Sequence, residues 1–130
     1  MDCVYPDPNM CRTVYVYSTM TFLPFVYGLY IGKFDIALCQ FLIMCFSTLY
    51  WINPRELTSL VYTFFFIPYL VIEMSKTQYA FLCFFFGIMT ASSYCLCCDF
   101  YRNEEYWISV CFHLLMYFFF NASITTLYLN

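Results

Sequence analysis

Five long stretches without a charged residue dominate this sequence and limit the folds that it can adopt. They run over residues 13–32, 36–54, 57–72, 77–98 and 106–130. A helix that crosses a bilayer needs about 20 mostly apolar residues, with about 17–25 observed. Four stretches reach this length directly, and the third reaches it if its helix runs from Pro54 to about Met74. The sequence therefore predicts membrane-spanning helices.

Composition excludes the main classes of soluble protein. Hydrophobic residues make up 64% of the chain and charged residues 10%, whereas a soluble domain has about 45–50% and about 25%. Five Lys and Arg residues cannot form the basic patch that nucleic-acid binding requires, and disorder needs low hydrophobicity. We therefore expect an integral membrane protein whose surroundings are the lipid bilayer. The aromatic fraction of 25% favours an AT-rich genome such as that of a large DNA virus.

The expected fold class is all-α: a polytopic bundle of about five antiparallel spans in a single integral membrane domain. The spans are expected at residues 13–32, 36–52, 54–74, 77–98 and 104–128. The short connections between them force consecutive helices to be antiparallel neighbours. The alternative is four spans, with the third stretch buried or re-entrant.

Polar residues between the stretches predict where helices begin. Asp35 and Asn103 are expected N-caps, and Ser75 to Gln78 matches the Ser-x-x-Gln capping box. Pro24 and Pro68 lie inside expected spans and predict kinks there.

The positions of the basic residues predict the orientation. With five spans, Arg12, Arg55 and Arg102 lie on the N-terminal side, and Lys33 and Lys76 lie on the opposite side. Lys and Arg near span ends concentrate on the cytoplasmic face, so three against two predicts a cytoplasmic N-terminus. The acidic start of the chain and its long first apolar run predict a retained anchor and no cleaved signal peptide.

A polar stripe follows the last expected helix. Its members recur every four residues, which gives a drift of about 40° at each step; they are Ser109, His113, Tyr117, Asn121 and Thr125. Polar groups inside a span are expensive unless they are paired. We expect the stripe to form interhelical hydrogen bonds of about 0.6 kcal/mol each. The alternative is a proton path or ligand pocket centred on His113 and Asn121.

Small residues four apart predict where helices approach closely. Gly28 and Gly32 form a GxxxG pattern, and Gly87 and Ala91 form a second small-xxx-small pair. Such faces allow two helix backbones to come together in a membrane. We therefore expect these four positions to mediate helix packing.

Nine cysteines form the other notable group. Six are expected near the N-terminal side, namely Cys3, Cys11, Cys95, Cys97, Cys98 and Cys111. Cys95 and Cys98 form a C-x-x-C pair that can cycle between dithiol and disulfide, with Cys3 and Cys11 as a second pair. In this outline the chain resembles quinone-linked oxidoreductases such as the vitamin K epoxide reductase and DsbB families. The alternatives are small packing residues, palmitoylation sites and a zinc site.

Residues 47–54 end the second expected helix. Together with His113 in the last helix, they resemble the Ser-x-x-x-His and late-His pattern of the CREST membrane hydrolase and receptor superfamily, which has related small proteins in large DNA viruses. The resemblance implies Ser47 and His113 as remnants of its site. The family uses seven helices and three zinc-binding histidines, whereas this chain has one His, so metal hydrolysis is not expected. Tyr50 and Trp51 also fit an aromatic belt at headgroup depth.

These patterns predict a small non-catalytic multi-pass membrane protein without cofactor or metal. It would act through helix packing with itself or with partner membrane proteins in a host, organelle or virion membrane. The principal alternative is a membrane thiol–disulfide oxidoreductase that uses Cys95 and Cys98. A third function is a minimal transporter or ligand-binding bundle around His113.

Overall fold

The structure is a computed structural model that describes residues 5–52, 61 and 64–129, and its regular elements there are all helices. They are α1 (Pro8–Ser18), the 3₁₀ turn η1 (Thr19–Thr21), α2 (Phe22–Tyr30), α3 (Phe34–Ile52), α5 (Ile67–Lys76), α6 (Ala80–Arg102) and α7 (Tyr106–Tyr128). The described part of the chain contains no strand, which confirms the all-α class. The third expected span lies partly outside the described residues, and α5 covers its second half.

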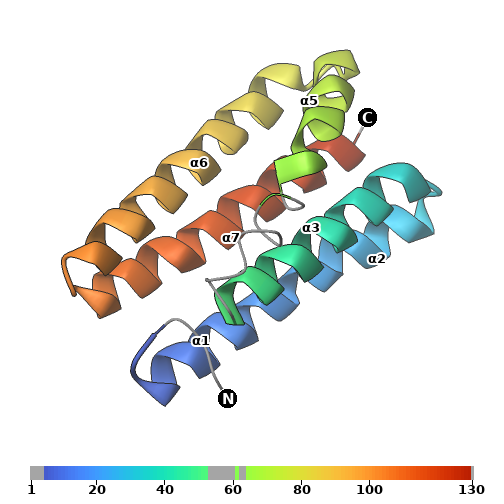
Figure 1. Ribbon diagram of the computed structural model, residues 1–130. Helices are drawn as coiled ribbons and strands as arrows, with labels where there is room; N and C mark the ends of the chain where they lie inside the picture. The colour runs from blue at the N-terminus through green and yellow to red at the C-terminus, as the bar shows by residue number, and fades with distance from the viewer. Residues whose placement is uncertain (1–4, 53–60, 62–63, 130) are drawn as a thin grey trace.

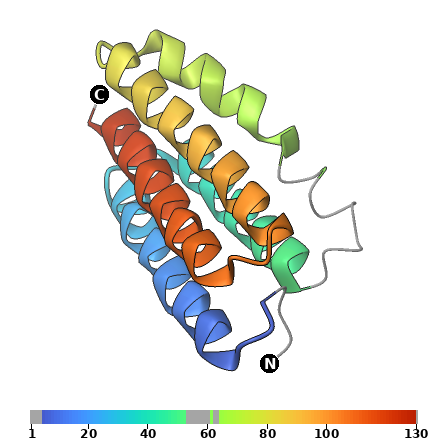
Figure 2. The same ribbon diagram turned by 90° about the vertical axis from the view of Figure 1, so that its left-hand side faces the viewer.

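The helices run alternately up and down along one bundle axis (Figure 1). α6 and α7 form a long antiparallel pair, and α2 packs on α3. α1 and α2 also contact α7, and α5 covers the outer side of α6 (Figure 2). The start of α1 and the end of α7 therefore lie at opposite ends of the bundle.

The first helical rod is continuous from residue 8 to residue 30 but changes its hydrogen bonding midway. Asp7 caps it, because its carboxylate accepts a 2.8 Å hydrogen bond from the backbone N–H of Asn9. The η1 turn ends three residues before Pro24, a residue that cannot donate a backbone hydrogen bond. Pro68 is the second residue of α5; residues 64 and 65 are also helical, and the turn residue Phe66 separates them from α5, so the helical path is interrupted two residues before this proline.

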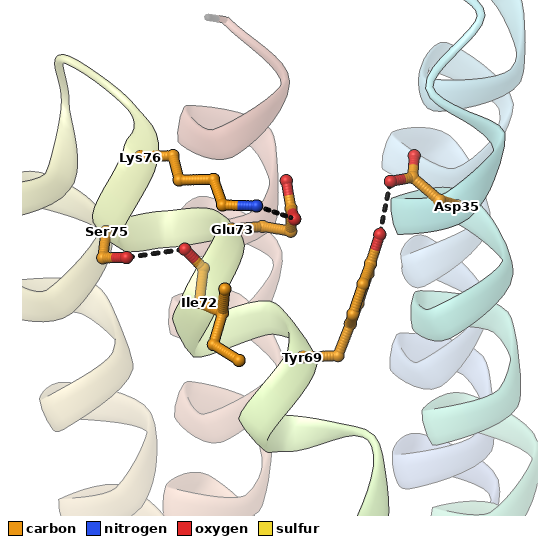
Figure 3. Close-up of polar contacts among 6 residues, drawn as sticks. All are labelled: Asp35, Tyr69, Ile72, Glu73, Ser75 and Lys76. Carbon is orange, nitrogen blue, oxygen red and sulfur yellow. Dashed lines mark hydrogen bonds and ion pairs between the residues drawn. The ribbon is translucent and has the colours of Figure 1, made fainter.

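The predicted capping box between the third and fourth spans is wrong. Ser75 lies inside α5, where its hydroxyl donates to the carbonyl oxygen of Ile72 at 2.6 Å (Figure 3). The Oγ1 of Thr77 instead accepts a hydrogen bond from the N–H of Tyr79 in the turn, and α6 begins only at Ala80. Because Ser and Thr side chains bond equally well to backbone in turns and in helix ends, a two-residue shift of register changes which residue caps.

Two other predicted caps also have different roles. Asp35 lies in the first turn of α3, which begins at Phe34. Asn103 follows the last residue of α6 and donates its backbone N–H to the carbonyl of Asp99. Glu104 then adopts a left-handed conformation with φ of +61°, which reverses the chain so that α7 begins at Tyr106.

The distribution of buried and exposed side chains in this bundle differs from that of a water-soluble protein. Gln40, Ser109 and His113 are fully buried, whereas many large apolar side chains face outward, among them Leu23, Tyr30 and Phe81 at 74%, 85% and 82% exposed. Soluble monomers rarely expose large continuous apolar surfaces, whereas polar residues within a membrane face the bundle interior. Within the described residues, α6 and α7 are long and apolar enough to span a bilayer.

Charged side chains occupy the ends of the helices. At the upper end in Figure 3, the Nζ of Lys76 lies 3.0 Å from Glu73, and the hydroxyl of Tyr69 donates to the Asp35 carboxylate at 2.5 Å. At the same end, the Nζ of Lys33 donates to the carbonyl of Leu127 at 3.3 Å, where the negative end of the α7 dipole favours a cation. The apolar middle of the bundle is thus bordered by polar ends.

The Asp35–Tyr69 contact gives a pH-dependent contribution to stability. The hydrogen bond from Tyr69 lowers the pKa of Asp35. This contribution is therefore present above the ordinary Asp pKa of about 3.9 and is lost as the pH falls through the lowered value. Because Asp35 is exposed, we expect Tyr69→Phe to remove about 1 kcal/mol or less. The unfolding temperatures of the wild type and of Tyr69→Phe in detergent should differ at pH 7 and converge in acid. A difference that stays constant with pH would contradict the Asp35–Tyr69 contact as its source.

Candidate functional site

Four polar side chains from three parts of the chain meet inside the lower half of the bundle. They are Tyr5 before α1, Cys97 on α6, and Ser109 and His113 on α7, and we call them the polar centre. All four are buried, three of them completely. The antiparallel packing of α6 on α7 brings Cys97 level with Ser109, and the N-terminal segment lays Tyr5 across both.

The hydroxyl of Tyr5 lies at the middle of the polar centre. Its oxygen is 3.1 Å from Nδ1 of His113, 3.2 Å from Oγ of Ser109 and 3.5 Å from Sγ of Cys97. Ser109 also donates to the backbone carbonyl of Cys97 at 2.8 Å, and its Oγ lies 3.4 Å from the Cys97 sulfur. Tyr5 therefore joins two helices through one oxygen atom.

The hydrogen bonds of the polar centre are mutually compatible. Ser109 gives its hydrogen to the Cys97 carbonyl, so its oxygen can accept one from the Tyr5 hydroxyl or the Cys97 thiol. Tyr5 then donates to His113, or accepts from it in the other tautomer. Burial raises the pKa of Tyr5 well above its ordinary value, which keeps the phenol protonated. The arrangement is a hydrogen-bond network in which each group stabilises the others; it engages the imidazole of His113 through Nδ1, and the buried Nε2 of that ring takes no part in it.

The predicted polar stripe separates into a buried part and an outward part. Ser109, His113 and Tyr117 are buried, and the rings of His113 and Tyr117 stack with centroids 5.0 Å apart. Asn121 is half-buried, and its Oδ1 has no hydrogen-bond partner among the described residues. Thr125 is exposed. The drift of about 40° per step turns the stripe away from α6 over four turns.

A second buried polar contact joins the upper end of α7 to α3 and to the η1 turn. The hydroxyl of Tyr128 donates to Oε1 of Gln40 at 2.8 Å, and Nε2 of Gln40 donates to the carbonyl of Thr21 at 3.1 Å. The Tyr128 ring lies against Gly28, where an added Cβ would be 2.5 Å from the ring carbon Cζ. Gly28 is therefore a close-packing position inside the bundle.

The other small residues lie in different surroundings. Gly32 ends the first rod with φ of +81°, and the N–H of Lys33 bonds back to the carbonyl of Gly28, which is the Schellman pattern. Gly87 has no described atom within 4 Å of an added Cβ, and Ala91 is exposed. The Gly87–Ala91 face of α6 is thus open on the outside of the described bundle.

The cysteines are in two oxidation states. Cys11 is disulfide-bonded. The seven other described cysteines are free, and Cys3 lies outside the described residues. Cys95 is exposed and Cys98 is half-buried, one helical turn apart on α6. Among the residues that the structure describes, no group of three or more His, Cys, Asp or Glu side chains could hold a metal.

A shallow depression of about 360 Å³ lies near the α6–α7 turn. Its lining includes Met10, Glu105 and Trp107 and contains no member of the polar centre. The side chain of Ser47, on which the CREST resemblance depends together with His113, lies outside what the structure describes.

Sequence reasoning found His113 and Ser109 but missed Tyr5, Gln40 and the role of Cys97. The four-residue spacing of Ser109 and His113 on one helix is visible in the sequence, whereas Tyr5, more than 100 residues away, gives no periodic signal. Gln40 was a usable signal, because a lone amide inside an apolar span needs a partner.

No protein-family model, curated protein or solved structure matches this chain.

Proposed function

We propose that this chain is a small non-catalytic multi-pass membrane protein that acts by lateral association with itself or with partner membrane proteins. The exposed apolar side chains carry the proposal: large apolar residues face outward as well as forming the core, while polar groups bond to one another inside. Lipid is the surroundings in which this distribution is stable. The five-span arrangement, with two antiparallel pairs and the third span completed through residues 54–66, belongs to the same proposal.

The geometry of the polar centre supports a structural role. Tyr5, which closes the network, comes from the chain itself and fills the position next to His113 that a ligand would need. Hydrogen bonds between helices hold a bundle together where water is absent. The centre therefore fixes the N-terminal segment and α6 to α7.

The open face of α6 supports association with another helix. Gly87 and Ala91 leave the backbone accessible, and the large apolar residue Ile88 between them is exposed. A second transmembrane helix can approach closely at such a face, because only small side chains separate the two backbones. Gly28, in contrast, already contacts Tyr128 within the bundle.

Gly87→Ile tests this proposal. We expect at least about tenfold weaker self-association or partner recovery, equivalent to about 1.4 kcal/mol, with an unchanged unfolding temperature. Association is measured by energy transfer between labelled copies in bilayers and by recovery of co-purifying membrane proteins. The control is Gly87→Ala, which adds one methyl group and should retain association. Wild-type and variant proteins should both stay in the membrane pellet after alkaline extraction; release of the wild type would overturn the membrane assignment, and unchanged association of Gly87→Ile would overturn the role of this face.

A further inference from the structure

Three free cysteines at the lower end of α6 and α7 lie in unusual positions for their residue type. Cys95 and Cys111 are exposed, and Cys98 is half-buried. Cysteine is among the most buried residue types in folded proteins, and Cys83 and Cys97 on the same helix follow that rule with no exposed surface. The exposed thiols contribute little to packing within the bundle.

These thiols share one depth, close to the charged end of the bundle. The hydrogen bond between Ser109 and the Cys97 carbonyl places residues 97 and 109 level on antiparallel helices, so Cys95 and Cys111 are level too. With a rise of 1.5 Å per residue, Cys98 lies about 6 Å and Cys95 about 10 Å from Arg102. Arg102 pairs with Asp99 there at 3.7 Å. The thiols therefore lie just inside the boundary between headgroups and acyl chains.

The surfaces beside these thiols are apolar. Leu96, Ile108 and Leu115 are exposed next to them along α6 and α7, and Trp107 lies nearer the turn. An alkyl chain attached to Cys111 and directed toward the middle of the bilayer would pass the exposed Leu115, which lies one helical turn farther from the α6–α7 turn. With five spans, Arg12, Arg55 and Arg102 are expected at this end and Lys33 and Lys76 at the other, so the positive-inside rule predicts this end as the cytoplasmic one.

The geometry points to Cys95, Cys98 and Cys111 as S-acylation sites that carry long-chain fatty acyl groups. The acyl donor is a fatty acyl thioester of coenzyme A on the cytoplasmic side. The cysteine sulfur attacks the acyl carbonyl carbon, a new thioester bond forms, the bond from that carbon to the coenzyme A sulfur breaks, and the proton leaves with the coenzyme A thiol. No electron transfer is involved. Cys11 is unavailable because its sulfur is already in a disulfide; at 3% exposed it is also shielded from soluble thiol reductants.

The inference rests on the membrane placement in the proposed function, and alkaline extraction tests that placement separately. In the test, the full chain is expressed in eukaryotic cells, free thiols are blocked, and thioesters are cleaved with neutral hydroxylamine. The released thiols are labelled with a 5-kDa polyethylene glycol maleimide. We expect up to three hydroxylamine-dependent mass steps, one for each labelled thiol. Each of the single variants Cys95→Ser, Cys98→Ser and Cys111→Ser should lose one of these steps. Cys83→Ser, a free but buried cysteine on the same helix, is the matched control and should keep all steps.

Each outcome decides the assignment. Hydroxylamine-dependent steps that disappear in the triple variant support it. Thiols that are blocked fully at the start, or mass steps that persist in the triple variant, overturn it. In a Cys11→Ser variant, thiols that are released by dithiothreitol but not by hydroxylamine, and that are absent when Cys95 and Cys98 are also replaced by Ser, would overturn it and would instead support a Cys95–Cys98 redox pair. In each case the fraction in the alkaline-resistant pellet shows whether the membrane assignment itself has failed.

Discussion

Gly28→Ile should lower the stability of this protein more than any other single substitution proposed here. A Cβ at residue 28 would lie 2.5 Å from both Cζ and the hydroxyl oxygen of Tyr128, so the ring must leave its position. Overpacking costs about 1–3 kcal/mol, and loss of the 2.8 Å bond from Tyr128 leaves Oε1 of Gln40 without its partner, at a further cost of about 1–3 kcal/mol. We expect about 2–6 kcal/mol in total, measured by thermal unfolding in detergent micelles.

Gly87→Ile provides the matched comparison for this prediction. It makes the same chemical change within a helix, but no described atom lies within 4 Å of the added Cβ. The two variants should therefore separate stability from association: the residue 28 variant loses its fold, and the residue 87 variant loses its partner. Equal loss of stability in both would contradict the internal position of Gly28.

His113→Ala should be the next most damaging change. It removes the imidazole from a site with no exposed surface and leaves the Tyr5 hydroxyl without its 3.1 Å partner. The cavity and the lost hydrogen bond together cost about 3 kcal/mol. Tyr5→Phe removes only the hydroxyl, so we expect about 1–2 kcal/mol from that change. Thermal unfolding in micelles measures both.

A double-mutant cycle that combines Tyr5→Phe with His113→Ala measures the interaction between these two side chains. If Tyr5 and His113 act as one unit, the combined loss of stability should fall short of the sum of the single losses by at least about 0.5 kcal/mol. Membrane insertion and association should persist in each single variant. A His113→Ala protein that keeps its stability but loses a ligand-dependent or proton-dependent signal would refute the structural role and favour a ligand-binding bundle.

The apolar stretches predicted the positions of the helices because spanning length and charge placement are properties of the local sequence. Helices α3, α6 and α7 follow the expected ranges within a few residues. The turns were predicted less well. Ser75 and Asn103 each had a cap-like neighbourhood, but both belong to the preceding helix or its end. Local chemistry alone does not decide between two helix ends that are separated by three residues.

The candidate site was only partly predictable for a different reason. Periodicity shows which residues share a face of one helix, as it did for Ser109 and His113. It carries no information about which distant residue meets that face, so Tyr5 and Cys97 could not be assigned. The GxxxG pattern likewise showed that Gly28 permits a close approach, but not that the approaching group is the ring of Tyr128.

The Tyr128–Gln40 hydrogen bond also constrains how this protein is made. Gln40 is synthesised 88 residues before the tyrosine that satisfies its side-chain oxygen, so the early helices form with that oxygen lacking its native partner. His113 and Tyr5 are separated by 108 residues in the same way. Assembly is therefore completed only when the final helix arrives, and a ribosome stalled before Tyr128 would leave an immature intermediate for the quality-control machinery to recognise.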